Sequence, residues 1–467
     1  MSSHAPNEEA AAPASPSRRR ELSQQLRLAL PIIVAQVGMM GMGLVDMIML
    51  GWYGEAGDGG VALAAVGQGN MLFFGGFTFA MGVMLGLDPV LSQALGADDR
   101  RGFARGVQRG FVLIPLLALV ASIPLLFAGT LLEWANQPLE ARAFAVDYCY
   151  WSLPGVPFML GFVVLRSALQ ALERLRPILL TVLAANVLNA LLDLILIHGW
   201  LGFPALGSTG SAIASSLGRL FMFATLALVA LKTLRPLVLP LDPAALQRAP
   251  LLRLLRIGSS VGAQNLLEFG AFAGVGMFMG HFSTTEQAGH MIAMNLAAMS
   301  FMVPLGFGIA ASVRVGKAVG RGDGEAARRA AWMALALGAG FMVASGATYL
   351  AIPETLASLY TDKADVLAVA ATLLPLAAAF QLFDGTQVVG LGVLRGANDT
   401  AVPALVNFLG YWVFGLPFGY WLAFHTDVGY PGLWWGLVVG LAVVAVILVL
   451  RIRAKLATVV PRVDLDR

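Results

Sequence analysis

The sequence has a single cysteine and few charged residues. One cysteine, Cys149, excludes an internal disulfide and any metal or iron–sulfur site built from several cysteines, so we expect no redox chemistry. Charged residues make up 12% of the chain, whereas about 25% is usual for soluble domains. Hydrophobic residues make up 58% and are spread over the whole length, which leaves no room for a large soluble domain. We therefore predict an integral membrane protein whose function lies within the membrane.

The N-terminal segment differs in composition from the rest of the chain. Residues 1–20 are rich in Pro, Ala and Ser and end in three arginines, which is typical of disordered chain. We expect residues 1–24 to form a disordered cytoplasmic tail. The next apolar segment is about as long as a membrane-spanning helix and has no small-residue cleavage pattern behind it, so we expect it to remain as the first helix.

Apolar segments of membrane-spanning length recur along the chain, separated by charged or Gly/Pro-rich breaks. Twelve are found, at 26–52, 62–88, 107–131, 143–165, 178–198, 206–231, 252–280, 287–312, 327–350, 366–390, 400–424 and 431–452. If both termini lie inside, all but three of the 30 Lys and Arg residues fall on that side or at its helix ends, the exceptions being Arg142, Lys363 and Arg219. Because cytoplasmic loops are enriched in Lys and Arg, we expect both termini in the cytoplasm. The basic balance then reflects topology and indicates no nucleic-acid binding.

The second half of the chain repeats the first. Three pairs of segments match in order at offsets of 228, 224 and 226 residues: LALPIIVAQ (28–36) with LRIGSSVGAQ (255–264), QALGADDRRGFARG (93–106) with KAVGRGDGEAARRA (317–330), and LQALERLRPIL (169–179) with LRGANDTAVPAL (394–405). A unit with an even number of helices gives two copies of the same orientation. We therefore predict an all-α polytopic membrane protein with twelve transmembrane helices in two six-helix lobes, 25–236 and 237–456, related by parallel pseudo-two-fold repeats and followed by a cytoplasmic tail, 457–467.

Ionisable side chains interrupt five of the apolar segments, at Asp46, Asp193, Arg219, Glu268 and Asp384. A charged side chain at the bilayer centre costs about 2.5 to 3.5 kcal/mol on insertion scales. Four uncompensated carboxylates would therefore cost about 10 to 14 kcal/mol, which is comparable with the whole stability of a typical protein. These acids must be neutral, paired, bound to an ion, or placed in a water-filled cavity.

Each of these states suits a transporter driven by an ion. Burial favours the protonated form of a carboxylate, and clustered oxygens bind hard cations. Asn189 and Asp193 are four residues apart, so they share one face of a helix. We expect Asp46 to meet them in the first lobe, and Glu268 and Asp384 to form a second cluster in the other lobe. The alternative for each buried acid or amide is a structural hydrogen bond between helices.

Two other groups of residues have less specific interpretations. We interpret Arg219 as the ion-pair partner of a neighbouring acid, or as a snorkelling side chain, in preference to a substrate ligand. Methionines crowd the first, seventh and eighth segments. Flexible Met side chains suit the binding of differently shaped apolar compounds, but they are also ordinary packing residues in a bilayer.

Several motifs resemble the multidrug and toxic compound extrusion (MATE) family. They cover nearly the whole chain in order and comprise GLVD (43–46), QALGA (93–97), FMVPLG (301–306) and LRGAND (394–399). QNLLEFG around Glu268 and FDGTQVVGLGVLRG around Asp384 are similar to the NorM-like branch of that family. The chain departs from the usual pattern at Gly289-His290-Met291, where the family motif commonly ends in His-Gln, and at Phe380, where some NorM-like members carry Tyr.

The resemblance implies export of lipophilic, often cationic compounds in exchange for inward Na⁺ or H⁺, by alternating access of a cavity between the lobes. It implies that Glu268 and Asp384 bind the coupling ion, and ligate Na⁺ if Na⁺ is used. The first-lobe ion-coupling residues would be Asp46, Asn189 and Asp193, with Thr209 as a weaker candidate. Residues expected to contact the transported compound are Gln36, Gln264, Met291 and Phe380.

The resemblance also implies a multi-pass protein of the bacterial cytoplasmic (inner) membrane. We expect a monomer that contacts membrane lipids and small organic compounds, binds no nucleic acid, needs no cofactor beyond the coupling ion and is not an enzyme. One alternative is a lipid-linked oligosaccharide flippase of the related superfamily, but such proteins line their cavity with basic residues, whereas Arg219 is the one clear intramembrane base here. An intramembrane enzyme such as a prenyltransferase would need repeated Asp-rich motifs, and AANVLNALLDLIL supplies one Asp.

Overall fold

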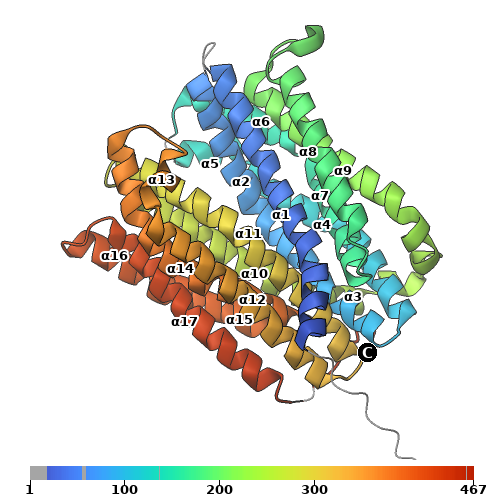
Figure 1. The fold of residues 1–467 in the computed structure, drawn as a ribbon. Helices are drawn as coiled ribbons and strands as arrows, with labels where there is room; N and C mark the ends of the chain where they lie inside the picture. The colour runs from blue at the N-terminus through green and yellow to red at the C-terminus, as the bar shows by residue number, and fades with distance from the viewer. Residues whose placement is uncertain (1–17, 55–58, 136, 459, 467) are drawn as a thin grey trace, which may run out of the picture.

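The computed structural model describes residues 18–54, 59–135, 137–458 and 460–466, and within these ranges it contains helices and no strand (Figure 1). In chain order the elements are α1 (Arg18–Gly54), α2 (Gly59–Leu85), α3 (Leu87–Gly96), α4 (Arg100–Leu126), α5 (Ala128–Trp134), α6 (Leu139–Ser152), α7 (Gly155–Ala171), α8 (Arg176–Leu196), η1 (Trp200–Gly202), α9 (Gly207–Val238), η2 (Pro243–Leu246), α10 (Arg248–Met279), α11 (Thr284–Gly320), α12 (Gly324–Ala351), α13 (Pro353–Ser358), α14 (Ala364–Gly396), α15 (Ala401–Phe408), the π-helix η3 (Leu409–Gly415), α16 (Leu416–His425) and α17 (Pro431–Lys455).

Each of the twelve predicted apolar segments lies mostly in helix where the structure describes it, with short turns inside or at the ends of some segments. Within the described ranges, ten helical stretches are long and apolar enough to cross a membrane, and α6 with α7 forms an eleventh that is bent by 48°. The twelfth, α10, is 32 residues long but carries Gln264, Asn265 and Glu268, which make it less apolar. The predicted all-α polytopic fold is confirmed.

The N-terminal boundary differs from the prediction. Helix α1 already begins at Arg18, so residues 18–24 are helical and do not belong to a disordered tail. The reason is a set of bonds to the second lobe, because Arg314 of α11 pairs with the buried Glu21 and donates to Gln25 Oε1 at 2.9 Å. The remainder of the predicted tail, residues 1–17, lies outside the described residues.

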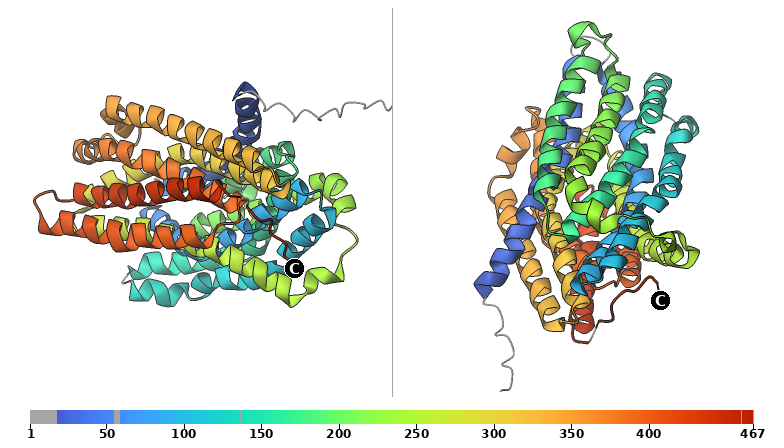
Figure 2. Two further views of the ribbon diagram at one scale, coloured as in Figure 1. Left: turned by 90° about the horizontal axis from the view of Figure 1, so that it is seen from below. Right: turned by 90° about the vertical axis from the view of Figure 1, so that its right-hand side faces the viewer.

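The helices form two lobes that meet at one end of the molecule. The N lobe comprises α1 to α9 and the C lobe α10 to α17. Helices α1 and α3 pack on α11, and α2 packs on α10. Figures 1 and 2 show these helices converging near α3 and the C-terminus, whereas α13 and α16 lie on a separate arm from the α8–α9 connection. We call the converging end, which contains the α3–α4 and α11–α12 turns and the C-terminal segment, the basic end, because Arg100, Arg101 and Arg321 lie in or beside these turns.

Glycines allow the backbones of the two lobes to touch at the basic end. A Cβ atom added to Gly82 of α2 would lie 2.5 Å from the Cα of Gly262 in α10. One added to Gly86 would lie 2.7 Å from the Cα of Gly258. Side chains larger than hydrogen would therefore separate the helices, and small residues at helix interfaces are the usual means of close approach in membranes. We call this contact the glycine seam.

Side chains add bonds between the two lobes beside the glycine seam. Gln93 of α3 donates from Nε2 to the carbonyl oxygen of Gly396 at the end of α14, at 2.9 Å. Lys317 of α11 pairs with Glu173, beyond the end of α7, at 2.7 Å. Both bonds join the N lobe to the C lobe, so the basic end is held closed by polar contacts as well as by backbone packing.

The C-terminal segment 460–466 lies across the basic end and contacts both lobes. We call it the C-terminal strap. The Val463 N–H donates to Gln93 Oε1 of the N lobe at 2.7 Å, and Arg253 Nη1 of the C lobe donates to the Leu465 carbonyl at 2.9 Å. The Leu465 side chain is 5% exposed. The strap therefore packs into the junction between the lobes.

The strap ends in a cluster of ion pairs. Asp466 accepts from Arg105 Nη1 at 2.9 Å and also pairs with the buried Arg109 of α4. Partial burial raises the pKa of the Asp466 carboxyl, but the bonds from the two arginines outweigh it and hold the pKa below its usual range. A carboxyl whose pKa is lowered by folding stabilises the fold above its unfolded pKa of about 3.9, and this contribution is lost as the pH falls through the folded value.

We expect the strap to stay docked between pH 8 and 5 and to detach under stronger acidification or in Asp466→Asn. A fluorophore on Pro461→Cys reports this, because the native Cys149 is buried. Its anisotropy should stay constant over that pH range in the parent chain and fall at neutral pH in Asp466→Asn. Asp427→Asn, which removes a charge from the α16–α17 turn, is the matched control. Equal anisotropy in the two variants would contradict the docking role of Asp466.

We expect Gly82→Ala to destabilise the closed seam by about 1 to 3 kcal/mol, the usual cost of overpacking. The control is Gly67→Ala on the same helix, where an added Cβ meets no atom within 4 Å. Gly67→Ala should leave the unfolding temperature unchanged or raise it, since Ala favours helix over Gly. Thermal unfolding in detergent compares the two, and a Gly82→Ala midpoint at or above that of Gly67→Ala would refute the seam's tight packing.

Candidate functional site

The first acid cluster joins α1, α8 and α9. Asp46 is 6% exposed, and Ser215 Oγ of α9 donates to its Oδ2 at 2.9 Å. Asn189 and Asp193 of α8 are fully buried and lie close enough to interact with the Asp46 side chain. The structure thus brings together the three first-lobe residues that the sequence predicts to meet, through the four-residue spacing on α8.

Most polar atoms of this cluster lack a bonding partner. Among the described residues, none bonds to Asp46 Oδ1, to either Asp193 oxygen or to either polar atom of Asn189. A buried polar group without a partner costs about 1 to 3 kcal/mol. The cluster therefore offers several acceptors to a proton or a cation. Thr209, the weaker candidate, lies in the first turn of α9, and no bond joins it to the described atoms of the cluster.

Arg219 lies one turn beyond Ser215 on α9. Its guanidinium stands 3.9 Å from the centre of the Phe73 ring of α2, which is a cation–π contact. It interacts electrostatically with Asp46, but among the described residues no acid is in ion-pair contact with it. The predicted ion pair is therefore replaced by stacking on an aromatic ring within the N lobe.

The second acid cluster joins α10 and α14. Glu268 Oε2 accepts weak bonds from Gln387 Nε2 at 3.3 Å and from Asn407 Nδ2 at 3.5 Å. Tyr411 donates to Gln387 Oε1 at 3.0 Å. Asp384 is 4% exposed and close enough to Glu268 for the two like charges to interact. The structure therefore brings Glu268 and Asp384 together, as the sequence predicts.

The second cluster also has unpaired acceptors. Asp384 Oδ1 and Asn407 Oδ1 are buried without a partner among the described residues. Carboxylate and amide oxygens are the ligands that hard cations prefer. The described residues contain no group of three or more His, Cys, Asp and Glu side chains suited to a metal ion. Two carboxylates with neutral oxygens fit an exchangeable monovalent ion or a proton.

Four members of the clusters are missing from the sequence-based prediction, namely Ser215, Gln387, Asn407 and Tyr411. Gln387 lies three residues after Asp384 on one helix, so spacing could have identified it. Asn407 and Tyr411 lie where α15 gives way to the π-helix η3. A π-helical turn shifts the register of the side chains, and such turns are frequent at functional sites. Their pairing with α10 and α14 follows from this local irregularity.

Arg395 connects the second cluster to the seam. It lies at the end of α14 and interacts electrostatically with Glu268 on one side and with Asp88 of α3 on the other. Asp88 is 3% exposed and also faces Arg166 of α7. Arg395 is therefore within electrostatic reach of an acid in each lobe, Glu268 in the C lobe and Asp88 in the N lobe.

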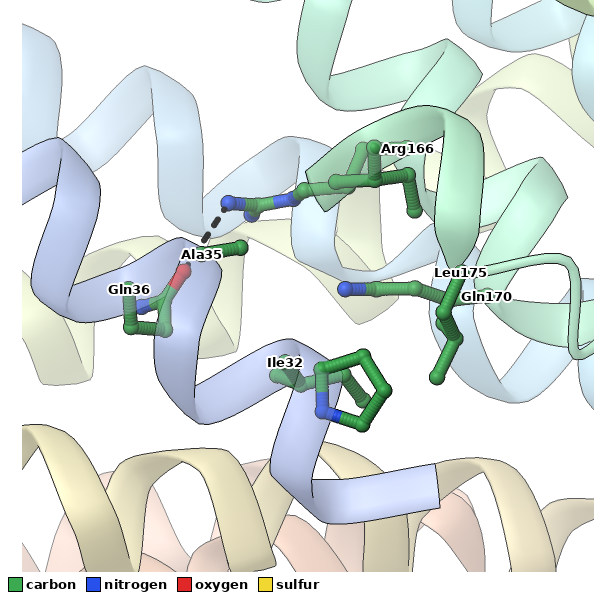
Figure 3. Close-up of a pocket in the computed structure, with 8 residues that line it drawn as sticks. Ile32, Ala35, Gln36, Arg166, Gln170 and Leu175 are labelled. Atoms are coloured by element: carbon green, nitrogen blue, oxygen red, sulfur yellow. Dashed lines mark hydrogen bonds between the residues drawn. The ribbon is translucent and has the colours of Figure 1, made fainter. Parts of the chain in front are cut away.

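The predicted substrate residues do not converge on one site. Gln36 lines a small pocket beside α7, where Arg166 Nη1 donates to its Oε1 at 3.5 Å (Figure 3). Gln264 is 3% exposed on α10, next to the seam residue Gly262. Met291 is 64% exposed on α11.

Phe380 is enclosed within the C lobe. It is 2% exposed, with ring centres 5.9 Å from Phe272 and 5.8 Å from Trp434. Trp434 in turn donates to His290 Nδ1 at 3.2 Å. In this conformation Phe380 belongs to an aromatic core and is not accessible to a ligand. The sequence places Phe380 one turn from Asp384, but this spacing does not determine the direction in which the ring packs.

The sequence of this chain is similar to a known family model and to proteins of known class. The model of the MatE family matches residues 31–195 and 261–421. Multidrug resistance protein NorM of Burkholderia vietnamiensis is 36% identical over 456 residues, which cover 96% of this chain and 97% of that protein. Multidrug resistance protein MdtK of Edwardsiella ictaluri is 32% identical over 93% of this chain and 95% of its own.

Solved structures share the fold. The eukaryotic MATE transporter AtDTX14 superposes with a TM-score of 0.86 at 21% identity, over 94% of this chain and 98% of its own. A multidrug resistance MATE transporter in an outward-facing conformation gives a TM-score of 0.84 at 20% identity, over 94% and 96%. The family model covers both lobes, and the relatives match over nearly their full length. The chain therefore belongs to the MatE family of membrane transporters.

Proposed function

We propose that this protein exports lipophilic, often cationic organic compounds in exchange for an inward-moving Na⁺ or H⁺. The observation that carries the proposal is the pair of buried acid clusters, one in each lobe, with oxygens that lack a bonding partner. Relatives named as multidrug resistance proteins support the class of substrate. A carboxylate that always stays charged can remain in water. A carboxylate that alternates between its charged and neutral forms needs surroundings that change the relative free energies of the two forms, and burial does this.

We assign the basic end to the cytoplasm of a bacterial inner membrane, because cytoplasmic loops carry the excess of Lys and Arg. The glycine seam then closes the cytoplasmic side, and the conformation faces outward. The protein works as a monomer, since each chain contains both lobes and both clusters. Transport, and not catalysis, is the activity proposed.

In the outward-facing state, Glu268 and Asp384 take up the coupling ion. Their negative charge, which helps to hold a cationic compound, is then neutralised, so the compound leaves. Each charge that moves down 100 mV supplies about 2.3 kcal/mol, before any concentration gradient. Loading also changes the surroundings of Arg395, whose remaining acidic partner is Asp88 at the junction with the N lobe. Uptake of the ion therefore acts on the seam as well as on the substrate.

We expect Asp384→Asn to abolish coupled efflux, because an amide has the size of the carboxyl but cannot release a proton or balance a cation. Efflux of a fluorescent cationic dye from sealed vesicles, driven in turn by a Na⁺ and a pH gradient, measures this and identifies the coupling ion. Asp362→Asn, in the exposed α13–α14 turn, is the control. Full efflux by Asp384→Asn under the gradient that drives the parent chain would overturn the assignment.

We expect Phe380→Ala to destabilise the protein by about 3 to 5 kcal/mol, as for other buried aromatic residues.

Met291→Ala should leave the unfolding temperature unchanged, because its side chain is 64% exposed, and should weaken dye binding if Met291 contacts the transported compound. Thermal unfolding and dye binding by fluorescence polarisation separate these effects. Unchanged dye binding in Met291→Ala would remove that residue from the substrate site.

A further inference from the structure

A second kind of site lies at the basic end, away from both acid clusters. A cavity of about 390 Å³ opens between the beginning of α12 and the end of α17. Arg328 and Trp332 line it from α12, and Arg453, Leu456 and Ala457 line it from α17 and the residues after it. Figure 1 shows both helix ends on the side of the molecule where the chain terminates. The transport mechanism above uses none of these residues.

The two arginines of the cavity are not neutralised by the protein. Both are exposed, and the described residues provide neither with a hydrogen-bond or ion-pair partner. The nearby acids are engaged elsewhere, since Glu325 pairs with Arg329 at 2.5 Å and Asp399 pairs with Arg451 at 2.7 Å. The cavity therefore presents two free guanidinium groups, which suit a phosphate because their planar donors match its oxygens.

The surface beside the arginines is apolar. Trp332 lies one turn from Arg328 and is 41% exposed. On α17, Leu450 and Val446 lie three and seven residues before Arg453, on the same face, and are 59% and 55% exposed. Tryptophan is enriched where headgroups meet hydrocarbon. The site thus has an anion-binding head at the membrane boundary and an apolar surface that leads into the bilayer.

We propose that this cavity binds an anionic phospholipid of the membrane leaflet at the basic end. Arg328 and Arg453 hold the phosphate, Trp332 packs against the glycerol region, and the acyl chains follow the exposed face of α17. Basic pockets between transmembrane helices are known lipid headgroup sites in general. A soluble phosphate would use the arginines but not the apolar face. Both α12 and α17 pack on α14, the helix of Asp384, so the lipid braces the helices around the second cluster.

The test is lipid binding to the purified full chain in non-ionic detergent, measured by native mass spectrometry with phosphatidylglycerol and with zwitterionic phosphatidylcholine. The double variant Arg328→Gln/Arg453→Gln should bind phosphatidylglycerol about thirtyfold more weakly than the parent chain binds it. This factor corresponds to about 1 kcal/mol for each basic side chain that is lost. Phosphatidylcholine binding should not change. Arg321→Gln, an exposed arginine at the same end but outside the cavity lining, should behave like the parent chain.

Two further measurements separate a lipid from a soluble ligand. Trp332→Ala should weaken phosphatidylglycerol binding, and inorganic phosphate should not displace the lipid. If the double variant binds phosphatidylglycerol as Arg321→Gln does, the site is refuted. If inorganic phosphate displaces the lipid and itself binds in a manner that depends on both arginines, the site belongs to a soluble anion and the lipid proposal fails. The unfolding temperature of each variant verifies that it is folded. None of these results depends on which ion drives transport.

Discussion

The structure depends on one constraint, the cost of placing a carboxylate in hydrocarbon. Asp46 and Glu268 each accept hydrogen bonds from a neighbouring helix, and Asp193 and Asp384 each lie close to the other acid of their own cluster. Among the described residues, hydrogen bonds reach only one oxygen of Asp46 and one of Glu268, and neither oxygen of Asp193 has a partner. Incomplete satisfaction is costly for a purely structural residue, but it is what a site needs if a proton or cation is to supply the missing bond and later leave.

The same constraint explains why the lobes meet through glycines and not through charge alone. The backbones of α2 and α10 touch at Gly82 and Gly262, and neither residue has a side chain that the contact would have to desolvate. The charged contacts, such as Lys317 with Glu173 and Arg105 with Asp466 of the C-terminal strap, lie at the basic end and are partly exposed to water. Backbone packing at the glycines and polar bonds at the basic end thus act together to hold the two lobes against each other.

The sequence predicts those features of the fold and of the site that depend on the spacing of residues along a helix. The twelve helices follow from apolar length, and the meeting of Asp46 with Asn189 and Asp193 follows from a four-residue spacing. It missed the parts set by local irregularity or by the direction of a side chain. The π-helix that carries Tyr411, the stacking of Arg219 on Phe73 and the burial of Phe380 all depend on which neighbour a side chain meets in three dimensions.

The internal repeat relates the helices of the two lobes but not the positions of their buried acidic residues. At the offset of 228 residues that aligns α1 with α10, Asp46 corresponds to Gly274 and Glu268 corresponds to Met40. The two clusters therefore occupy different places in equivalent helices and are connected differently. Arg219 stacks within its own lobe, whereas Arg395 interacts electrostatically with Glu268 and with Asp88 of the other lobe. Glu268 is therefore linked through Arg395 to a residue of the other lobe, whereas the partners of Asp46 all belong to its own lobe, so a change of charge at the two acids would be felt in different parts of the fold.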